Sequence, residues 1–242
     1  MAKLGGAVIT DLSKPFTYRA DVASALSEEI SSSDERVVVV HGRGSFAKAA
    51  PAQPASLPGQ VESPAGGTAQ ARASVYELNR LVCKTMTEAK LSPYPFSPFD
   101  ALARAGPSSA GQWLRGLLKE GFTPVTFCDF VLSPHGMRFM DADAMAYEVA
   151  KTLKPDRCVF ALDVDGVYED NSRVILPELS PSKIRKMKAP AEDQAARAIR
   201  AKLEIAGRIA STGPSVSFVS GYRRNEFSKA LRGLDFYGTA IR

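Results

Sequence analysis

Five short runs of apolar, mostly β-branched residues recur along the chain and predict buried strands. They cover residues 7–10, 37–40, 124–127, 159–162 and 216–219. Because both faces of such a run are apolar, each strand is expected to be covered on both sides of a sheet.

Helical patterns separate these runs. Val22, Leu26 and Ile30 repeat every four residues, as one face of an amphipathic helix does. Two further stripes comprise Val75, Leu78, Val82 and Met86, and Ile199, Leu203 and Ala206. Strands that alternate with helices need crossover connections, so we expect an α/β fold with a mainly parallel central sheet and helices on both sides.

One stretch fits neither pattern. Residues 49–73 are mostly Ala, Pro, Gly, Ser and Gln, with almost no large apolar side chain. Such a segment cannot bury itself, so we expect a mobile loop or lid. With neither an internal repeat nor a convincing linker, the chain is expected to form a single domain over residues 1–242.

The composition is that of an ordinary globular protein. The chain has 242 residues, of which 45% are hydrophobic and 24% are charged. A chain of this length and composition can build a core without disulfides or bound metals. Cys83, Cys128 and Cys158 lie far apart with no CxxC pair, which favours a reducing cytoplasm over a disulfide framework or a zinc ribbon. No apolar run approaches the length of a membrane span, so we expect no membrane insertion.

The net charge of +5 is a mild excess that suits anionic ligands such as phosphates. Basic residues are scattered, and they form one tight run at Lys183, Arg185, Lys186 and Lys188. We interpret that run as a solvated loop rather than a nucleic-acid patch, and expect no nucleic-acid partner.

Two glycine turns carry the first chemical signal. Lys3-Leu4-Gly5-Gly6 opens the chain, and His41-Gly42-Arg43-Gly44-Ser45-Phe46-Ala47-Lys48 follows the run at 37–40. Glycines let amide groups approach a phosphate closely, and lysine supplies a mobile cation. A strand, a glycine turn and a helix start are typical of a phosphate cradle, although the first turn alone is equally well read as a plain tight turn. The GxxxxGK[ST] spacing of a Walker A loop is absent.

Carboxylates collect where strands are expected to end. They are Asp129, Asp141, Asp143, Asp163 and Asp165. At such an edge a carboxylate can orient a lysine, bind Mg²⁺ through water or hold a ribose hydroxyl, and some of these residues could instead cap helices. His135, between Pro134 and Gly136, is interpreted as a turn residue.

Several longer motifs resemble those of a known family. HGRGSFAK is similar to HGxGSFGH, GFTPVTFCDFVL to GFxPVxxGDxVL, and LKPDRCVFALDVDGVY to LKPxxxVFLTDVDGVY. On these motifs the chain resembles the amino-acid kinase superfamily, and within it the isopentenyl phosphate kinases, over essentially its whole length.

The resemblance implies a three-layer α/β/α sandwich whose amino-terminal half binds the acceptor and whose carboxyl-terminal half, from about residue 155, binds the nucleotide. It implies transfer of the γ-phosphate of ATP, with Mg²⁺, to isopentenyl phosphate or a related alkyl phosphate, in a homodimer. The transfer asks mainly for alignment and charge stabilisation, and no general base is needed because the acceptor phosphate is already anionic.

The roles carried over from the family fall into three groups. Catalytic roles fall on Lys3, Lys48 and Asp143, with Asp143 orienting Lys3. Nucleotide-binding roles fall on Gly5, Gly6, Asp163, Asp165, Gly166, Tyr168 and Lys202. Acceptor-binding roles fall on Gly42, Arg43, Gly44, Ser45 and Asp129, and no protein side chain is assigned as a metal ligand.

The chain departs from the family pattern at several of these positions. Lys48 stands for a histidine, Leu12 for a lysine, and Cys128 and Ala142 for glycines; Asp141 replaces a serine, and 196–198 reads Ala-Arg-Ala where a Gly-Gly turn is expected. These departures keep two alternatives open: a related kinase with a changed acceptor, and a pseudoenzyme that binds a ligand or a partner without turnover. The 75–86 stripe could line a pocket for an isoprenoid chain or could simply pack on the sheet.

Overall fold

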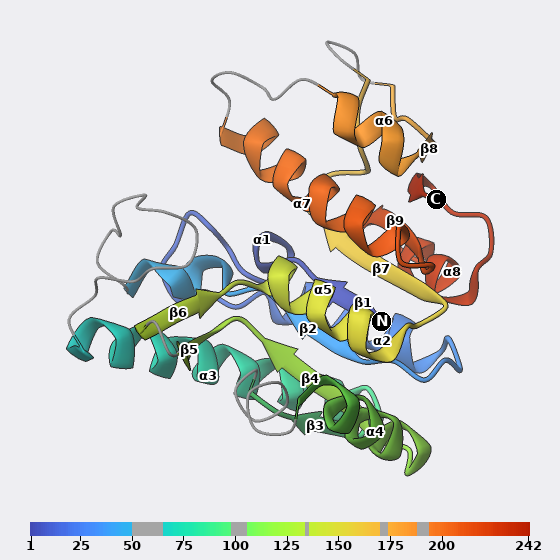
Figure 1. Cartoon of the computed structure of the whole chain (residues 1–242). Coiled ribbons are helices and arrows are strands. Elements are labelled where there is room, and N and C mark those ends of the chain that lie inside the picture. Colours follow the sequence, from blue (N-terminus) through green and yellow to red (C-terminus); the bar gives the residue numbers. More distant parts are fainter. Residues whose placement is uncertain (50–64, 98–105, 134–135, 170–173, 188–193) are drawn as a thin grey trace.

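The computed structural model describes residues 1–49, 65–97, 106–133, 136–169, 174–187 and 194–242 (Figure 1). In chain order its strands are β1 (Ala2–Leu4), β2 (Val39–His41), β3 (Pro93–Pro95), β4 (Thr123–Phe127), β5 (Asp129–Ser133), β6 (Gly136–Met140), β7 (Arg157–Leu162), β8 (Glu178–Leu179), β9 (Ser215–Ser220) and β10 (Gly238–Ile241). Its helices are α1 (Gly6–Ile9), α2 (Ala20–Ser31), the short 3₁₀ helix η1 (Gly44–Ala49), α3 (Ala65–Glu88), α4 (Gly106–Lys119), α5 (Ala142–Leu153), α6 (Pro181–Lys186), α7 (Gln194–Ala210) and α8 (Glu226–Arg232).

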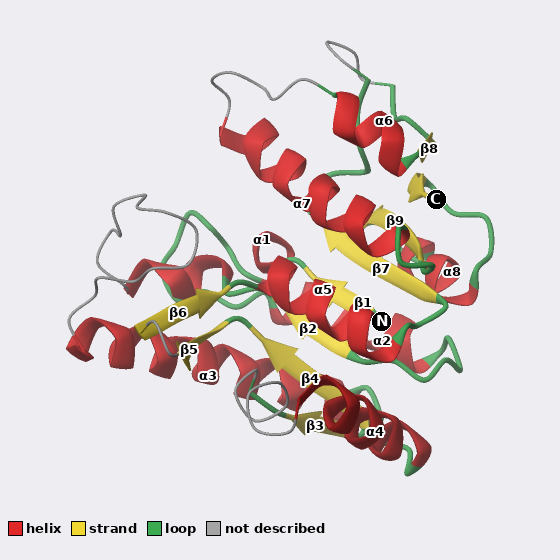
Figure 2. Ribbon diagram, in the orientation of Figure 1, coloured by secondary structure: helices red, strands yellow, loops and turns green. Residues whose placement is uncertain are grey.

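Eight of these strands form one sheet, in the order β3-β4-β2-β1-β7-β9-β10-β8. Every pair is parallel except β9 with β10. Strands β5 and β6 form a separate antiparallel hairpin that projects beyond the end of β4 (Figure 2). The α/β class with a mainly parallel sheet is therefore confirmed.

Two hydrophobic clusters cover the two faces of the sheet and complete three layers. One cluster joins the strands to α4, α5, α6, α7 and Val75 of α3, and the other joins them to α1, α2, α8 and the rest of the α3 stripe. Alternate strand residues serve alternate faces: Phe160 packs in the first cluster, and Val159 and Ala161 pack in the second. This is why the strand runs are apolar on both sides.

The stripes at 22–30, 75–86 and 199–206 are confirmed as α2, α3 and α7. Leu78, Val82 and Met86 are almost fully buried among strand and α2 side chains. That placement favours packing on the sheet over an isoprenoid pocket for this stripe.

Three expectations were wrong. Lys183, Arg185 and Lys186 were expected to lie in a loop, but they belong to helix α6, and Lys188 lies outside the described residues. Residues 7–10 were expected to be a strand, but Gly6–Ile9 forms helix α1, and the strand is Ala2–Leu4. Val8 and Ile9 are buried, so burial rather than strand pairing explains the apolar run. Residues 65–73 were expected to belong to a loop, but they open α3, where residues of high helix propensity such as Ala and Gln support a helix without a large apolar face. Residues 50–64 of that expectation lie outside the described residues.

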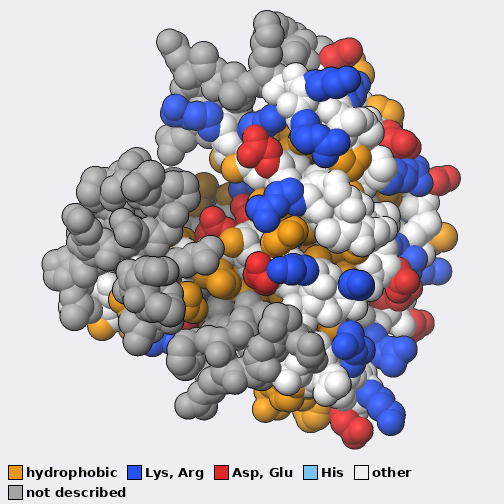
Figure 3. Space-filling view, viewed as in Figure 1, with side chains coloured by type: hydrophobic (Ala, Val, Ile, Leu, Met, Phe, Trp, Pro, Cys, Tyr) orange, Lys and Arg blue, Asp and Glu red, His pale blue; other side chains and the backbone are white. Residues whose placement is uncertain are grey.

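The remaining runs are confirmed with small shifts at their ends. The run at 37–40 overlaps β2, which pairs from Val39 to His41, while Val37 and Val38 are buried just before it. All three cysteines are free. On the face shown in Figure 3, Lys and Arg side chains are spread among acidic ones rather than gathered in one patch. None of the helices within the described residues combines the length and apolar character that crossing a membrane requires.

The two glycine turns lie at neighbouring strand ends and touch through their backbones. β1 pairs with β2, so Lys3 lies beside Val40 and the turns after both strands meet. A Cβ atom on Gly6 would lie 2.3 Å from the amide nitrogen of Gly44. Gly44 has a φ of +48°, and a Cβ there would lie 1.9 Å from Oγ1 of Thr10. These positions therefore require glycine for packing as well as for conformation.

We expect Gly44→Ala to lower the free energy of unfolding by about 3 kcal/mol, because strain at positive φ adds to a clash that backbone atoms cannot relieve. Gly116→Ala in α4 is the matched control, because nothing lies within 4 Å of a Cβ there, and we expect it to add about 0.5–1 kcal/mol. Urea denaturation of both variants measures the difference. Equal stability of the two variants would contradict the contact between the turns.

Candidate active site

Three charged side chains converge at the carboxyl end of β1. Lys3 is 2% exposed and forms an ion pair with Asp143 on the first turn of α5. Lys202 of α7 approaches the other oxygen of the same carboxylate, with Nζ 3.6 Å from Oδ2. Lys3 and Lys202 thus share the carboxylate of Asp143, although they lie 140 and 59 positions away from it along the chain. The family resemblance implies this pairing for Lys3 and Asp143.

Burial dominates the electrostatics of Lys3. It lowers the pKa of the ammonium group below its ordinary value, although Asp143 opposes the shift. For Asp143, burial alone would raise the pKa, but the charges of Lys3 and Lys202 outweigh it and hold the pKa below its ordinary value. At neutral pH the carboxylate is therefore ionised between two lysines.

A cleft of about 870 Å³ opens over this cluster. Its walls come from both glycine turns, from the start of α5, from the end of β7 and from the first half of α7. The predicted site residues that line it are Lys3, Gly5, Gly6, Gly42, Arg43, Gly44, Asp143, Asp163 and Lys202. Predicted residues from five separate segments therefore meet in one cavity.

The amino terminus of α5 faces this cleft. Asp141 caps the helix, because its carboxylate accepts a hydrogen bond of 2.7 Å from the amide of Ala144. The helix dipole is positive at this end and stabilises the charge of Asp143 in the first turn. Asp141 stands where the family pattern has serine, and it keeps the capping function that serine would provide.

The wall beside the second glycine turn is partly apolar. The guanidinium of Arg43 lies over the ring of Phe139 in β6, 4.4 Å from its centroid. Cys128 follows β4 at the same wall, and burial raises the pKa of its thiol to about 12. The thiol therefore stays protonated and acts here as a small apolar side chain.

Two of the predicted acidic residues are already paired with arginine. Asp129 is buried and accepts two hydrogen bonds from Arg72 of α3, at 2.7 and 2.9 Å. Asp165 accepts two from Arg223, at 2.6 and 2.9 Å. Neither carboxylate lines the cleft, so both fix the positions of neighbouring elements in this structure.

Other predicted residues do not line the cleft. Ser45 turns inward, where its hydroxyl accepts a hydrogen bond of 3.1 Å from the amide of Thr17. Gly166 packs against Thr239, whose Oγ1 accepts a hydrogen bond from the next amide, that of Val167. Tyr168 is 39% exposed. The side chain of Lys48 and all of His135 lie outside the described residues.

Sequence reasoning missed several lining residues. Phe139 belongs to a hairpin that the apolar pattern did not indicate, and Ile199 was read only as a core position. Leu12, noted as a departure from a family lysine, lines the cleft and is 48% exposed. Pro134 and Gly136, between the mostly apolar stretches 130–132 and 137–140, were the weak signal for the hairpin in the sequence.

We expect Asp143→Asn to cost about 3 kcal/mol of unfolding free energy at pH 7, because it leaves the buried charge of Lys3 without its main partner. The pKa of Lys3 falls further in this variant. A depressed lysine pKa means that the unfolded state binds more protons, so stability rises with pH between the folded pKa and the ordinary value. The difference in unfolding free energy between Asp143→Asn and the wild type should therefore shrink from pH 7 to pH 9.

Lys3→Met with Asp143→Asn is the matched double variant. We expect it to be more stable than Asp143→Asn alone, because no buried charge remains unpaired. Chemical denaturation at the two pH values measures both effects, and strictly additive losses would show that the two side chains do not interact.

Comparisons with known proteins agree with this geometry. The family model described as "Amino acid kinase family" matches residues 2–220. The isopentenyl phosphate kinase of Thermoplasma acidophilum is 31% identical over 173 residues, which cover 71% of this chain and 69% of that protein. The enzyme of the same name from Methanothermobacter thermautotrophicus is 29% identical over 185 residues, with the same two coverages.

A solved structure extends the likeness to the whole fold. The product complex of the T. acidophilum isopentenyl phosphate kinase superposes with a TM-score of 0.76 and 25% identity, covering 100% of this chain and 98% of that one. The three-layer sandwich that the motifs implied is thus confirmed. With a family model that spans most of its length and a cleft built from the matching motifs, this chain belongs to the amino acid kinase family.

Proposed function

We propose that this protein is an ATP-dependent kinase that transfers the γ-phosphate of ATP to isopentenyl phosphate and produces isopentenyl diphosphate. One observation carries the proposal: Lys3 and Lys202 converge on Asp143 in a cleft whose walls include both glycine turns. The relatives that bear the name isopentenyl phosphate kinase support the choice of acceptor.

The cleft suits a reaction between two anions. Bringing two phosphates together requires cations and amide dipoles to offset their repulsion. Lys3 lines the cleft just before the first glycine turn, where it would contact the phosphate in transfer. Asp143 would orient Lys3, and needs to abstract no proton because the acceptor is already ionised.

We propose that the two halves of the single domain divide the substrates. Gly42, Arg43 and Gly44 lie on the acceptor side, with Lys48 and Ser45 beside them in the same turn. Lys202 and Asp163 lie on the nucleotide side, in the half that begins near residue 155. Gly5 and Gly6 lie between, where ATP and the acceptor would meet.

The remaining assignments act around this core. We propose that Gly166 and Tyr168, in the turn after β7, shape the nucleotide site, with Asp165 anchoring that turn through Arg223. Asp129, paired with Arg72, would support the acceptor side without lining the cleft.

Mg²⁺ fits this site as a companion of ATP. Within the described residues, no group of three or more His, Cys, Asp or Glu side chains is arranged to hold a metal ion. Mg²⁺ commonly binds through phosphates, waters and one or two carboxylates, and Asp163 is a carboxylate at the nucleotide side of the cleft. When bound, the ion would neutralise phosphate charge, and we propose no protein cage for it.

The family resemblance further leads us to propose a homodimer that works in the cytoplasm. Light scattering on the purified chain tests the oligomeric state. A mass of twice the chain mass supports the homodimer, and the mass of one chain contradicts it.

Acceptor-dependent ADP release tests the proposed activity. With ATP and Mg²⁺, we expect isopentenyl phosphate to stimulate ADP release by the unmodified protein, and Lys48→His to retain that stimulation, because either side chain can donate to a phosphate. Release that never depends on the acceptor in either form, with ATP binding verified separately, would contradict the proposal.

Lys3→Met tests the central lysine. We expect it to lower kcat about 10²- to 10³-fold while changing the affinity for ATP little, because its charge acts mainly on the phosphate in transfer. Lys151→Met, which removes an exposed lysine from the far end of α5, is the control and should leave kcat unchanged. Equal losses in kcat and ATP affinity for Lys3→Met would contradict this role.

A further inference from the structure

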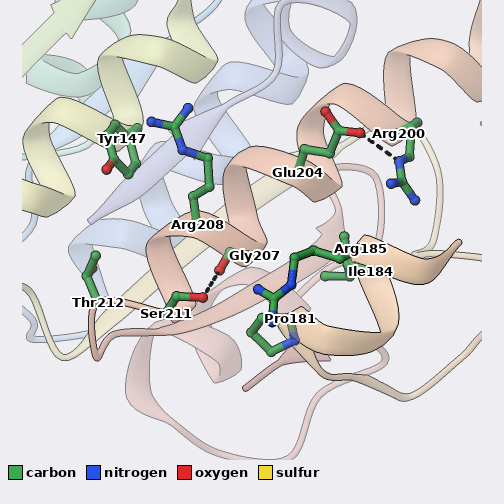
Figure 4. Close-up of a pocket in the computed structure, with 10 residues that line it drawn as sticks. All are labelled: Tyr147, Pro181, Ile184, Arg185, Arg200, Glu204, Gly207, Arg208, Ser211 and Thr212. Atoms are coloured by element: carbon green, nitrogen blue, oxygen red, sulfur yellow. Dashed lines mark hydrogen bonds and ion pairs between the residues drawn. The ribbon is translucent and has the colours of Figure 1, made fainter.

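A second hollow, of about 600 Å³, lies where α6 meets α7, with α5 forming its far side (Figure 4). None of the residues that line it lines the catalytic cleft. Helix α7 separates the two: Lys202 points to the cleft, whereas Arg200 and Glu204 border the hollow.

The hollow is strongly basic. Arg185 comes from α6, and Arg200 and Arg208 come from α7. Among the described residues that line the hollow, Glu204 is the one acidic residue against these three arginines, which leaves an excess of two positive charges.

The pairing within the hollow is incomplete. Nε of Arg200 donates to Glu204 at 2.9 Å, but Nη1 of Arg200 is buried and has no hydrogen-bond partner among the described residues. Within the residues that the structure describes, neither Arg185 nor Arg208 forms an ion pair. Arg185 and Arg208 are exposed, so the buried unpaired donor here is Nη1 of Arg200. Buried donors normally find an acceptor, so this donor favours an anionic ligand beside it.

Apolar surface lies beside these charges. Ile184 is 2% exposed, and a Cβ on Gly207 would lie 3.4 Å from its Cδ1, so α6 and α7 pack closely at the base of the hollow. On the opposite side, the guanidinium of Arg208 lies 4.1 Å from the ring centroid of Tyr147. Figure 4 shows Arg208 extending toward Tyr147 and Arg185 reaching along α7. A ligand with an apolar body and an anionic group would satisfy both kinds of surface.

We propose that this hollow is a second binding site, for a small organic phosphate with an apolar or aromatic body. Its volume lies in the range of small-molecule sites. A phosphate monoester carries nearly two negative charges at neutral pH, which matches the excess of two guanidinium groups. A guanidinium group donates two parallel hydrogen bonds to a pair of oxygens. A phosphate offers more than one such pair of oxygens, whereas a carboxylate offers only one.

Two isoleucine methyl groups allow the two sites to be observed separately. Ile184 lines the hollow and Ile199 lines the catalytic cleft. In a protein labelled with ¹³C at the isoleucine δ1 methyls, titration with phenyl phosphate should shift the Ile184 signal along its own saturation curve, whatever happens at Ile199.

Matched variants assign the binding to the arginines. We expect Arg185→Met with Arg200→Met to weaken the Ile184 response at least tenfold and to leave the Ile199 response unchanged. Lys183→Met with Lys186→Met removes two charges from the same helix outside the hollow and should change neither response. The unperturbed isoleucine spectrum of each variant checks that it is folded.

Three outcomes would overturn the proposal. The Ile184 signal could fail to move with phenyl phosphate, or it could move with the same affinity in the double arginine variant. Benzoate could also bind as tightly as phenyl phosphate, which would remove the preference for phosphate. Ile199 reports ligand binding in the cleft, and acceptor-dependent ADP release reports the proposed kinase function, so a failure of that function would be seen in those measurements and not at Ile184.

Discussion

The site depends on a backbone contact between two glycine turns at the ends of adjacent parallel strands. Gly6 and Gly44 approach so closely that a methyl group on either would collide with the other turn. Thr10 joins them with one hydroxyl, which donates to the carbonyl of Gly6 at 2.7 Å and accepts from the amide of Ser45 at 2.9 Å. The floor of the cleft is therefore built from main chain, which holds its shape without depending on flexible side chains.

That floor forces a charge into a buried position. Lys3 precedes the first turn on β1, and its side chain points to the α5 face of the sheet, over the ring of Phe160. A buried ammonium group is costly unless it is paired, so Asp143 serves as its partner. The shared carboxylate also keeps Lys202 nearby, although the two lysines repel one another. An incoming phosphate would relieve this repulsion, which is a physical reason for the site to bind anions.

Helix α7 connects the two basic regions of the molecule. One of its faces packs on the sheet through Leu203 and Ala206, and Lys202 reaches the cleft beside that face. The face toward α6 carries Arg200 and Glu204. The apolar stripe of α7 packs in the core, and the polar residues on either side of that stripe can therefore line both the cleft and the proposed second site.

The sequence alone determined the alternation of strands and helices, the two glycine turns and the family. Apolar runs and apolar residues spaced four positions apart indicate which residues are buried. The buried residues divide between the two faces of the sheet. They could not separate α1 from a strand, because four buried apolar residues look alike in either conformation. The hairpin that supplies Phe139 was missed because its pairing is a contact between two segments and leaves little mark on either one.

Only the tertiary structure decided which of the acidic residues face the cleft. Asp129 and Asp143 both follow apolar segments, and both match family positions. Yet Arg72 occupies the first, and Lys3 and Lys202 share the second. A carboxylate's role depends on the cation that comes nearest in space, and these cations lie 57 to 140 positions away along the chain. The sequence names the charged groups, whereas the packing of strands and helices decides which of them meet.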